Sequence, residues 1–446
     1  MTLLQKAFEV IKIIESHGYT ALMVGGAVRD FVMSRPLQDI DLATDMPMEQ
    51  LFRIFNCRNI GKSKNFGILC IGYHNRHFEI SSFRRLDSVS HDSIGRGDDK
   101  YALFSADALC RDFTINAMAM DAPGNIIDPL GGISDIAGGI VRSASHADRV
   151  FHDDPLRMIR GIRFACAFHF VIEPATLTGI KRLCAEIENA APERIGNELL
   201  RLASLPGPDF ARGLVIMEEC GLLEYILPEI SRLRSCEHNP EHHPEGGVLD
   251  HTLAALKCSL HNEPAVNLAI LFHDAGKADT YKLKDGKHTY YRHEQAGPGI
   301  IKQAGQRLKL SQKLVRTICF AAENHMKGLR INEMRLSRVY RLMSDPDWPV
   351  LEEVIVSDLM SRGYEEEIVF RKRVEELREK IRHWLMPAVS LPVSGKEIMK
   401  YTGLSQGQEV GRLLREVSSW AMDNNITDPD RIREHILRLY TGKGLS

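Results

Sequence analysis

An aspartate pair that follows a glycine pair is the feature that most restricts the fold of this chain. Asp39 and Asp41 are separated by one residue, so on a strand both side chains point to the same face. Gly25 and Gly26 follow the apolar run at residues 21–24 and precede a short helical stretch. A strand, a glycine turn, a helix and a second, acidic strand are the pattern of a mixed α/β domain.

These two pairs suit the binding of a nucleoside triphosphate and divalent metal. Backbone amides at Gly25 and Gly26 can meet phosphate at a helix start. The carboxylates of Asp39 and Asp41 can hold Mg²⁺, which binds through one or two carboxylates together with substrate phosphates. Each pair alone also fits an ordinary tight turn or a solvated strand end. In this order and spacing they predict a site that displaces pyrophosphate from a triphosphate.

The 446-residue chain divides into four blocks by pattern. Strand-like runs alternate with short helices to about residue 139, and the pattern is helical from about residue 140. We therefore expect an α+β protein, with a mixed α/β head followed by an all-α neck, a further helical domain and a small helical tail. The expected boundaries are 1–139, 140–236, 237–386 and 387–446.

Composition narrows the class of protein further. No apolar run has the length of a membrane span, and the N-terminal residues 1–18 form a charged amphipathic helix rather than a signal peptide. We therefore expect a cytoplasmic protein with no membrane partner. Nine cysteines without short paired spacing argue against a disulfide framework and a structural zinc site. Nothing in these patterns specifies an oligomeric state.

The overall charge does not indicate a nucleic-acid partner by itself. The net charge is −2, so a polynucleotide would have to be held by local basic surfaces. Arg157, Arg160 and Arg163 recur at helical spacing and are candidates for such a surface. For any one of them, a solvated helix face explains the charge equally well.

A series of motifs runs through the first half of the chain. They are GGAVRD from residue 25, DIDLATD from residue 39, HFEISSFR from residue 77, CRDFTINAMAMD from residue 110, HDDPLRMIRGIRFA from residue 152 and ERIGNELLRL from residue 193. In this order they resemble the signature of class II tRNA nucleotidyltransferases and bacterial poly(A) polymerases, members of the DNA polymerase beta superfamily. The resemblance implies a nucleotidyltransferase head at residues 1–139 and a neck at 140–236 for base selection and RNA binding.

The resemblance also implies roles for individual residues in nucleotidyl transfer to an RNA 3′ end. Asp39, Asp41 and Glu79 are the implied catalytic carboxylates, with Mg²⁺ on the two aspartates, and the terminal hydroxyl attacks the α-phosphate in line. ATP, CTP and the tRNA 3′ end are the implied partners. The implied nucleotide-binding residues are Gly25, Gly26, Arg29, Asp30, Arg111, Asp112, Asn116, Asp154, Arg157, Arg160 and Arg163.

The helix expected from residue 152 is a candidate for selecting the base of the incoming nucleotide. Asp154 and Arg157 are three residues apart, so on one helix they would face the same way and offer acceptors and donors to one base edge. The alternative is an ion pair between the two on the helix surface. The family motif reads Glu-Asp-x-x-Arg, and its first position is here the shorter Asp153.

The RRDFTINA-like motif departs from the family at its first residue. Cys110 replaces an arginine and cannot supply a bidentate phosphate clamp. Weaker nucleotide affinity and compensation by Arg84 or Arg85 are the two expectations. For Asn116, the residue type favours a hydrogen bond to backbone in a tight turn, whereas the resemblance implies a place in the active site.

A second constellation of histidines and carboxylates lies in the third block. Helix-length intervals separate its members, so a helical bundle can project them into one metal pocket. His273 and Asp274 end an apolar run, and two polar groups at the end of a buried helix need partners. The set comprises His251, His273, Asp274, His293, His325 and Asp358.

This pattern resembles the HD superfamily of metal-dependent phosphohydrolases, and the two extra histidines resemble its dinuclear members. The resemblance implies an HD domain at residues 237–386 that holds one or two divalent transition metals, of unspecified identity. Its implied activity is phosphatase or cyclic phosphodiesterase activity on nucleotides or damaged RNA ends. Lys277 is either a phosphate contact or an ordinary surface lysine.

The last block, residues 387–446, resembles the C-terminal segment of some bacterial CCA-building enzymes. We expect it to contact tRNA, with a helical cap free of RNA as the alternative. The favoured function is CCA addition, because the polar segment between residues 83 and 111 is similar to a loop that supports the change from cytidine to adenosine. Addition of adenosine alone, poly(A) synthesis, a phosphohydrolase with a degenerate head and a non-catalytic RNA-binding protein are the alternatives.

Overall fold

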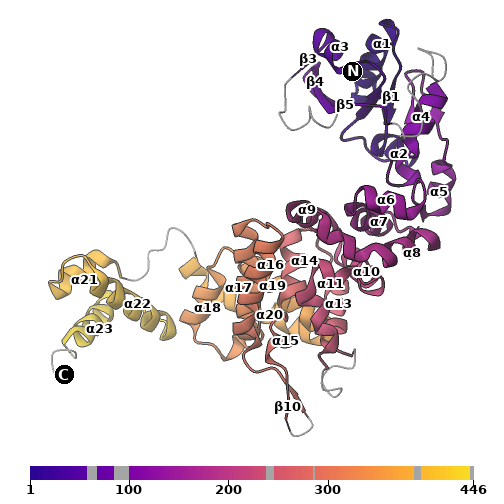
Figure 1. The fold of residues 1–446 in the computed structure, drawn as a ribbon. Coiled ribbons are helices and arrows are strands. Elements are labelled where there is room, and N and C mark those ends of the chain that lie inside the picture. Colours follow the sequence, from indigo (N-terminus) through magenta and orange to yellow (C-terminus); the bar gives the residue numbers. More distant parts are fainter. Residues whose placement is uncertain (58–67, 85–99, 238–245, 285–286, 386–392, 442–446) are drawn as a thin grey trace. The chain divides into compact units, whose positions relative to one another are not determined.

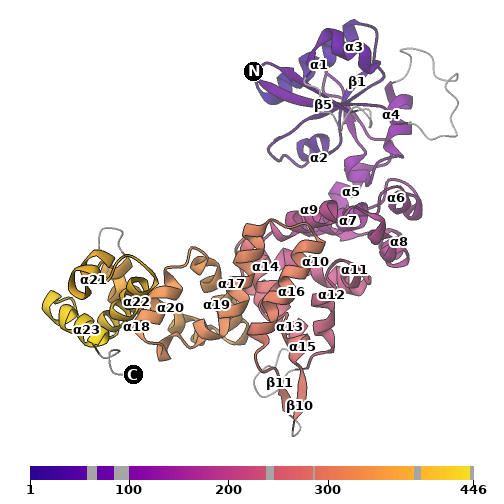
Figure 2. The same ribbon diagram turned by 60° about the vertical axis from the view of Figure 1, so that its left-hand side comes forward.

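The structure is a computed structural model, and its contacts divide the chain into two compact units (Figures 1 and 2). The first unit is Met1–Leu205 with Arg212–Ile226, and the second is Pro206–Ala211 with Leu227–Ser446. The structure describes residues 1–57, 68–84, 100–237, 246–284, 287–385 and 393–441. Arg85 and most of the polar segment after residue 83 lie outside the described residues, and the four predicted boundaries stay a prediction.

A seven-stranded mixed sheet lies at the centre of the head, in the order β3-β4-β5-β2-β1-β6-β7. β1 (Ala21–Val24) is buried along its whole length and runs antiparallel to β2 (Asp41–Thr44). β2 runs parallel to β5 (Arg76–Ser82), so the acidic start of one strand adjoins the other. The mixed α/β head is therefore confirmed. Its remaining strands are β3 (Asn56–Cys57), β4 (Ile68–Tyr73), β6 (Ala119–Met120) and β7 (Ile126–Ile127).

Short helices cover this sheet. α1 (Leu3–Ser16) begins with a capping box between Thr2 and Gln5, and it buries an apolar stripe that includes Val10 and Ile14 against the sheet core. Between the strands lie α2 (Gly26–Val32), α3 (Met48–Ile54), α4 (Lys100–Ala108), η2 (Thr114–Asn116) and α5 (Gly132–Gly138). α2 and η2 adjoin the ends of β1 and β6 and so position the glycine pair.

The remainder of the first unit is mostly helical, as expected, with two differences. A short parallel ladder joins β8 (Ile140–Val141) to β9 (Val171–Ile172). The single helix expected from residue 152 is two helices, α6 (Ala147–Asp153) and α7 (Leu156–Ala167). They are followed by α8 (Pro174–Leu183), η3 (Cys184–Asn189), α9 (Pro192–Ala203), α10 (Gly207–Glu219) and α11 (Leu222–Ile226).

The second unit is built around one apolar helix. α14 (Pro264–Phe272) is buried from Val266 onward and packs against α13 (Val248–Cys258), α17 (Gln312–Leu329) and α19 (Trp348–Arg362). Its other helices are α12 (Pro228–Ser231), η4 (Arg232–Ser235), α15 (Lys277–Thr280), α16 (His293–Arg307), η5 (Ile331–Glu333), α18 (Leu336–Met343) and α20 (Tyr364–Leu385). A hairpin of β10 (Lys282–Lys284) and β11 (Lys287–Thr289) projects from it.

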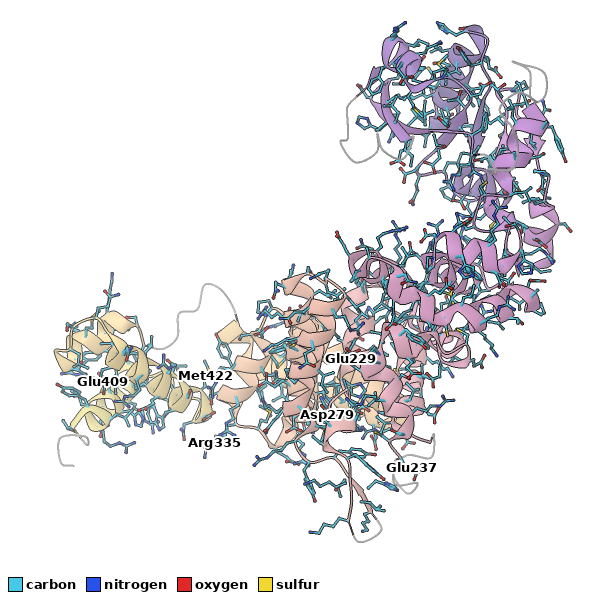
Figure 3. The ribbon with its side chains drawn as sticks, viewed as in Figure 1. Glu229, Glu237, Asp279, Arg335, Glu409 and Met422 are labelled. Atoms are coloured by element: carbon cyan, nitrogen blue, oxygen red, sulfur yellow. The ribbon has the colours of Figure 1, made fainter. Side chains whose placement is uncertain are left out.

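An ion pair joins the start of this unit to a distant helix. The Arg307 guanidinium at the end of α16 donates to both carboxylate oxygens of Glu229 in α12, at 2.9 and 2.8 Å. Glu229 is labelled in Figure 3. The pair is partly buried, so salt screens it less than it would a pair in open solvent. It therefore helps to hold α12 beside the helices that carry the histidines.

Three helices form the C-terminal part, α21 (Gly395–Thr402), α22 (Gln408–Asp423) and α23 (Pro429–Thr441). They share an apolar cluster that includes Ile398, Leu413, Val417 and Ile436. The predicted contact of this part with tRNA stays a prediction. Across the described residues, no helix combines the length and the apolar character that crossing a bilayer requires.

Candidate active sites

Three carboxylates predicted to be catalytic meet at one face of the head sheet. Ile40 is buried between Asp39 and Asp41, which are exposed, so the two aspartates share the opposite face as predicted. The strand begins only at Asp41, and Asp39 lies in the extended segment before it. Asp41 pairs in register with Glu79 on the parallel strand β5, which places their side chains next to each other on that face.

The charges of this group act on one another. The pKa of the Asp41 carboxyl is raised, first by loss of hydration and then by the negative charges of Glu79 and Asp39, whereas Arg111 lowers it. Mutual repulsion between carboxylates is the condition that a bound divalent cation relieves. The three residues therefore fit a metal site by charge and by chemistry, since oxygen ligands are the preferred donors of Mg²⁺.

The glycine pair adjoins an arginine of the RRDFTINA-like motif. Gly25 has φ 73° and caps α2, a conformation that favours glycine. A Cβ at this position would lie 3.2 Å from Arg111 Nη1. Asp107, one turn earlier in α4, holds the Arg111 guanidinium at 2.6 Å. Gly25, Arg111 and Asp41 thus surround one region, where a triphosphate is predicted.

A buried chain of polar side chains links this region to α7. The Arg29 guanidinium donates to Asp30 and, at 2.6 Å, to the Asn116 oxygen. The Asn116 amide donates to Asp112 at 3.1 Å, and Arg160 donates to Asp112 at 2.7 Å. The side chain of Asn116 therefore bonds two side chains, and the expectation that it would bond backbone is wrong. Sequence spacing could not reveal partners that lie 87 residues apart.

Asp112 is the centre of this chain. Its carboxylate accepts four hydrogen bonds, from the Phe113 amide, the Asn116 amide and twice from Arg160. Burial opposes its charge, yet Arg160 and Asn116 lower the pKa of Asp112 below its ordinary value. In this structure Asp112 holds the site together, and its contact with nucleotide stays a prediction.

Asp154 and Arg157 do not lie on one helix, and that expectation is wrong. Pro155 lacks an N–H and disfavours helical backbone at the residue before it, so Asp154 lies between α6 and α7 with φ −154°. The Asp154 carboxylate pairs with Arg194 of α9 at 2.9 Å. The Arg157 guanidinium donates to the Val150 and Cys110 carbonyls at 3.3 and 3.0 Å. The alternative, an ion pair between Asp154 and Arg157 on the surface of one helix, is also wrong, because within the described residues Asp154 pairs with Arg194 instead.

A glutamate of the ERIGNEL motif was not assigned a role from sequence. Glu198 is buried, and its two oxygens accept from Arg163 at 3.0 Å and Arg201 at 2.7 Å. Its partner Arg163 also lies over the ring of Phe164, 4.4 Å from the centroid. Its place among the apolar residues of an amphipathic helix was the available signal, because a buried carboxylate needs a cationic partner.

Cys110 stands where the family has an arginine. Burial and Asp107 raise the pKa of the Cys110 thiol, while Arg149 and Arg84 lower it. Arg84 is therefore close enough to act electrostatically at this position. Its predicted compensation for the lost arginine stays a prediction.

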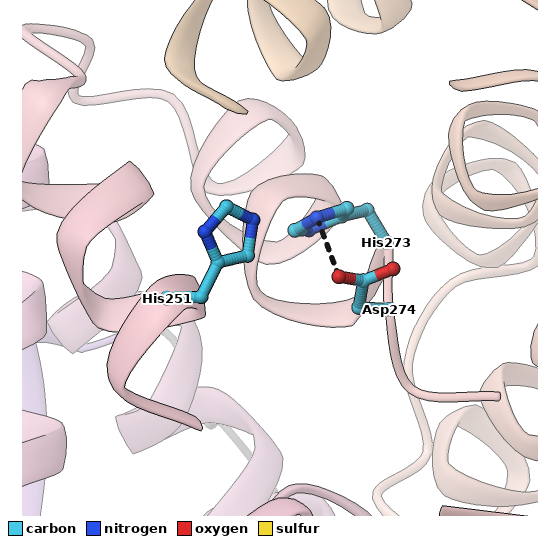
Figure 4. Close-up of side chains that lie close together, drawn as sticks. All are labelled: His251, His273 and Asp274. Atoms are coloured by element: carbon cyan, nitrogen blue, oxygen red, sulfur yellow. Dashed lines mark ion pairs between the residues drawn. The ribbon is translucent and has the colours of Figure 1, made fainter. Parts of the chain in front are cut away.

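The second constellation converges in the second unit. His251 and Asp358 meet at 2.8 Å, and His273 lies 3.2 Å from the adjacent Asp274 (Figure 4 shows His251, His273 and Asp274). On its other side Asp274 lies 3.2 Å from His293. Two groups of ligand atoms each lie within 4.8 Å of one another, and Asp274 belongs to both; they are His251, His273 and Asp274, and Asp274, His293 and His325.

The histidines are oriented in a common way. The Nδ1 atoms of His273, His293 and His325 each bond the backbone carbonyl three residues earlier, at 2.7, 2.9 and 2.7 Å. That bond fixes the tautomer and directs Nε2 to the centre, as in metal-ligating histidines. Nε2 of His293 and His325 approach to 3.1 Å. Burial and the nearby His273 lower the pKa of His325 to about 3, so its lone pair is available at neutral pH.

Cations also engage the carboxylates of this centre. The Lys277 ammonium lies 2.6 Å from Asp274, and the Arg362 guanidinium donates to both oxygens of Asp358 at 2.8 Å. Lys277 is buried, so its interpretation as a surface lysine is wrong. Imidazoles with a shared carboxylate fit one or two divalent transition metals, and several first-row ions suit such N/O donors.

Comparison with known proteins gives two family matches. The profile described as Poly A polymerase head domain matches residues 21–142. The profile described as probable RNA and SrmB-binding site of polymerase A matches residues 169–233. A multifunctional CCA protein of Halorhodospira halophila is 30% identical over 331 residues, which are 73% of this chain and 78% of that protein.

Solved structures share the fold. The Bacillus stearothermophilus CCA-adding enzyme in complex with CTP aligns with TM-score 0.61 and 23% identity over 100% of this chain and 99% of that one. A CCA-adding enzyme with ATP aligns with TM-score 0.65 and 20% identity, over 98% and 95%. The Thermotoga maritima CCA-adding enzyme complexed with tRNA-CCA aligns with TM-score 0.61 and 18% identity, over 97% and 93%.

Proposed function

The chain belongs to the family of the multifunctional CCA proteins, and on that premise we propose that it adds cytidine and adenosine to the 3′ end of tRNA. The observation that carries the proposal is the carboxylate face of Asp39, Asp41 and Glu79 beside Gly25 and Arg111. CTP, ATP and tRNA, which relatives of this fold bind, are the substrates.

Each residue of the face has a distinct part in the transfer. Asp39, Asp41 and Glu79 hold divalent metal, which stabilises the attacking and leaving oxygens when bound. Arg111, fixed by Asp107, offers its guanidinium to the phosphates beside the Gly25 backbone. Glycine at position 25 lets the backbone approach the phosphates closely.

The junction between α6 and α7 selects the base of the incoming nucleotide. Asp154 and Arg157 lie on either side of Pro155 and are held from different directions, by Arg194 and by backbone carbonyls. Hydrogen-bond donors and acceptors that are held in place can distinguish one base from another. A base whose edge does not match them leaves a polar group of the protein without a hydrogen bond, which costs free energy. We infer that this junction takes the place of a template strand.

Extension of defined tRNA transcripts tests the function. Transcripts ending at the discriminator base, at C and at CC are incubated with Mg²⁺ and with CTP, ATP or both, and products are resolved at single-nucleotide length. Completion of all three to CCA is the expected result. One adenosine added to CC alone would indicate an A-adding enzyme, long adenosine tails a poly(A) polymerase, and either result contradicts the proposal.

We also propose a metal-dependent phosphohydrolase activity for the centre around Asp274. The observation that favours it is the convergence of three Nε2 atoms and a shared carboxylate in a buried setting. The test is hydrolysis of p-nitrophenyl phosphate and bis-p-nitrophenyl phosphate after chelation and addition of Mn²⁺, Ni²⁺ or Mg²⁺. Metal-dependent hydrolysis that His273→Ala abolishes is expected, and no hydrolysis of either compound with any metal contradicts it.

A further inference from the structure

Two stacked phenylalanine rings of the first unit gather arginine side chains around them. Phe164 lies in α7 and Phe168 caps that helix one turn later. Their ring centroids are 5.8 Å apart, and the ring planes differ by 7°. Four guanidinium groups lie over one ring or both, at 4.4 to 5.8 Å from the centroids; they belong to Arg29, Arg35, Arg160 and Arg163. These distances are typical of cation–π interactions.

One of these four arginines differs from the others in its partners. The other three also pair with a carboxylate, in Asp30, Asp112 and Glu198 respectively. The side chain of Arg35 is exposed, and within the described residues it makes no hydrogen bond and no ion pair. Its guanidinium lies 4.9 Å from the centroid of the Phe168 ring. A ring attracts a cation without neutralising its charge, so the Arg35 guanidinium is available to an anion.

The backbone of Arg35 is fixed by the way in which α2 ends. Ser34 has φ 53°, and its amide donates to the Phe31 carbonyl at 3.0 Å. The Arg35 amide donates to the Asp30 carbonyl at 2.7 Å. These two bonds form a Schellman motif, and the proline that follows cannot continue the helix. Because backbone and side chain are both held, a ligand that binds Arg35 loses little conformational entropy in ordering it.

Arg35 lies close along the chain to the proposed catalytic carboxylates. Asp39 follows it by four positions, and four residues of fully extended chain span at most about 14 Å. The 3′ hydroxyl of the RNA has to lie at the carboxylate face in order to attack the α-phosphate. The backbone phosphates that precede the 3′ end therefore come within reach of an exposed guanidinium at position 35.

The incoming nucleotide has other cations at its predicted place. A Cβ at Gly25 would lie 3.2 Å from Arg111 Nη1, and one at Gly26 would lie 3.5 Å from Arg29 Nη2. These two guanidinium groups line the glycine pair, where the triphosphate is predicted. Exposed cations that follow a strand are the usual partners of a nucleic-acid backbone. The exposed Arg35 therefore fits the RNA strand better than the nucleotide.

We propose that Arg35 binds a backbone phosphate of the tRNA acceptor strand near its 3′ end, and that Phe168 is the positioning residue that holds the Arg35 guanidinium for this contact. The inference rests on the CCA-adding function proposed above and adds a residue that binds its RNA substrate. A guanidinium binds a phosphate through two parallel hydrogen bonds. Loss of the contact weakens the binding of RNA and leaves the binding of nucleotide unchanged.

The salt dependence of tRNA binding tests the phosphate contact without reference to activity. Each such contact adds about 0.7–0.9 to the slope of log Kd against the logarithm of the salt concentration. The Kd of a tRNA ending in CC is measured by filter binding from about 50 mM to about 200 mM KCl. We expect Arg35→Ala to lower the slope by about that amount and to raise Kd about five- to eightfold near 0.1 M salt. Arg53→Ala, which removes an exposed cation from the last turn of α3, should leave both values unchanged.

A double-mutant cycle tests the part of Phe168. Phe168→Leu should raise the Kd for tRNA, and Phe168→Tyr, which keeps the ring, should restore it. The ring also lies 4.8 Å from the Arg29 guanidinium, so its removal can act through that residue as well. In the Arg35→Ala background we therefore expect Phe168→Leu to weaken tRNA binding no further. Effects of the two substitutions that multiply would overturn the positioning role of Phe168.

Steady-state kinetics separates this proposal from the function on which it rests. With a tRNA ending in CC, Arg35→Ala should raise the KM for tRNA about five- to eightfold and leave the KM for ATP unchanged. A higher KM for ATP with unchanged tRNA binding, or an unchanged Kd and slope, overturns the RNA contact and leaves CCA addition intact. Wild-type protein that binds tRNA but adds no nucleotide overturns CCA addition, and the salt slope then still decides whether Arg35 binds RNA.

Discussion

Replacement of Asp112 by asparagine tests whether the buried polar chain holds the first unit together. The carboxylate accepts four hydrogen bonds through two oxygens, and asparagine keeps one oxygen, so two of them are lost. Removing one partner of a buried ion pair costs about 3–5 kcal/mol. Because the Arg160 side chain is 35% exposed, water compensates part of its charge, and we expect a loss of about 2–4 kcal/mol.

Urea unfolding can assign this loss to the correct unit. All three tryptophans, Trp348, Trp384 and Trp420, lie in the second unit, so tryptophan fluorescence follows that unit and far-ultraviolet circular dichroism follows both. We expect the dichroism transition of Asp112→Asn to move by about 1 M urea or more. Asp153→Asn, an exposed aspartate paired with Arg149 at 3.9 Å, is the control and should leave the transition in place. A transition in Asp112→Asn equal to that of the control would refute the reasoning.

The same variant has a defined dependence on pH. The pKa of Asp112 is lower in the folded chain than in the unfolded chain, so its contribution to stability is full above the unfolded pKa of about 3.9. It is lost as pH falls through the folded pKa. The difference in unfolding free energy between wild type and Asp112→Asn should therefore be constant near neutral pH and shrink below about pH 4.

Three further perturbations follow from the site geometry. Gly25→Ala strains a backbone at φ 73° and crowds Arg111, so kcat/KM for CTP should fall at least tenfold; Gly124→Ala, with φ 95° and open space around it, should not change it. Glu198→Gln leaves Arg163 without its carboxylate, and calorimetry should show a loss of about 2–3 kcal/mol. Asp274→Asn removes the ligand shared by both groups, and titration calorimetry with Mn²⁺ should detect no binding, whereas Asp279→Asn should bind as wild type.

Local pattern was sufficient for the features that a few adjacent residues determine. The acidic strand start at Asp41, the buried strand before Gly25 and the polar end of the apolar helix at His273 all lie where the sequence pattern places them. In each case the alternation of burial or the length of an apolar run carries the information. The chain belongs to a known family, and the order of that family's motifs predicts the order in which these features follow one another along the chain.

Long-range partners could not be inferred in this way. The bonds of Asn116 to Arg29 and of Arg163 to Glu198 join residues 87 and 35 positions apart. The spacing of residues along the chain does not predict hydrogen bonds over such distances. The break at Pro155 was different, because proline is a local signal for a helix end. The proline at position 155 was sufficient to predict that the helix is interrupted there, and the prediction of one continuous helix did not take it into account.

Loss of transfer in Asp41→Ala with retained tRNA binding is the most direct test of the central claim. Single-nucleotide extension of a tRNA ending in CC is measured with ATP and Mg²⁺, together with tRNA affinity by filter binding. Glu49→Ala, which removes an exposed carboxylate of α3, is the matched control. The account predicts that Asp41→Ala binds tRNA as wild type does and adds no adenosine, while the control extends normally. Extension by Asp41→Ala at the wild-type rate would contradict the assignment of this face as the catalytic site.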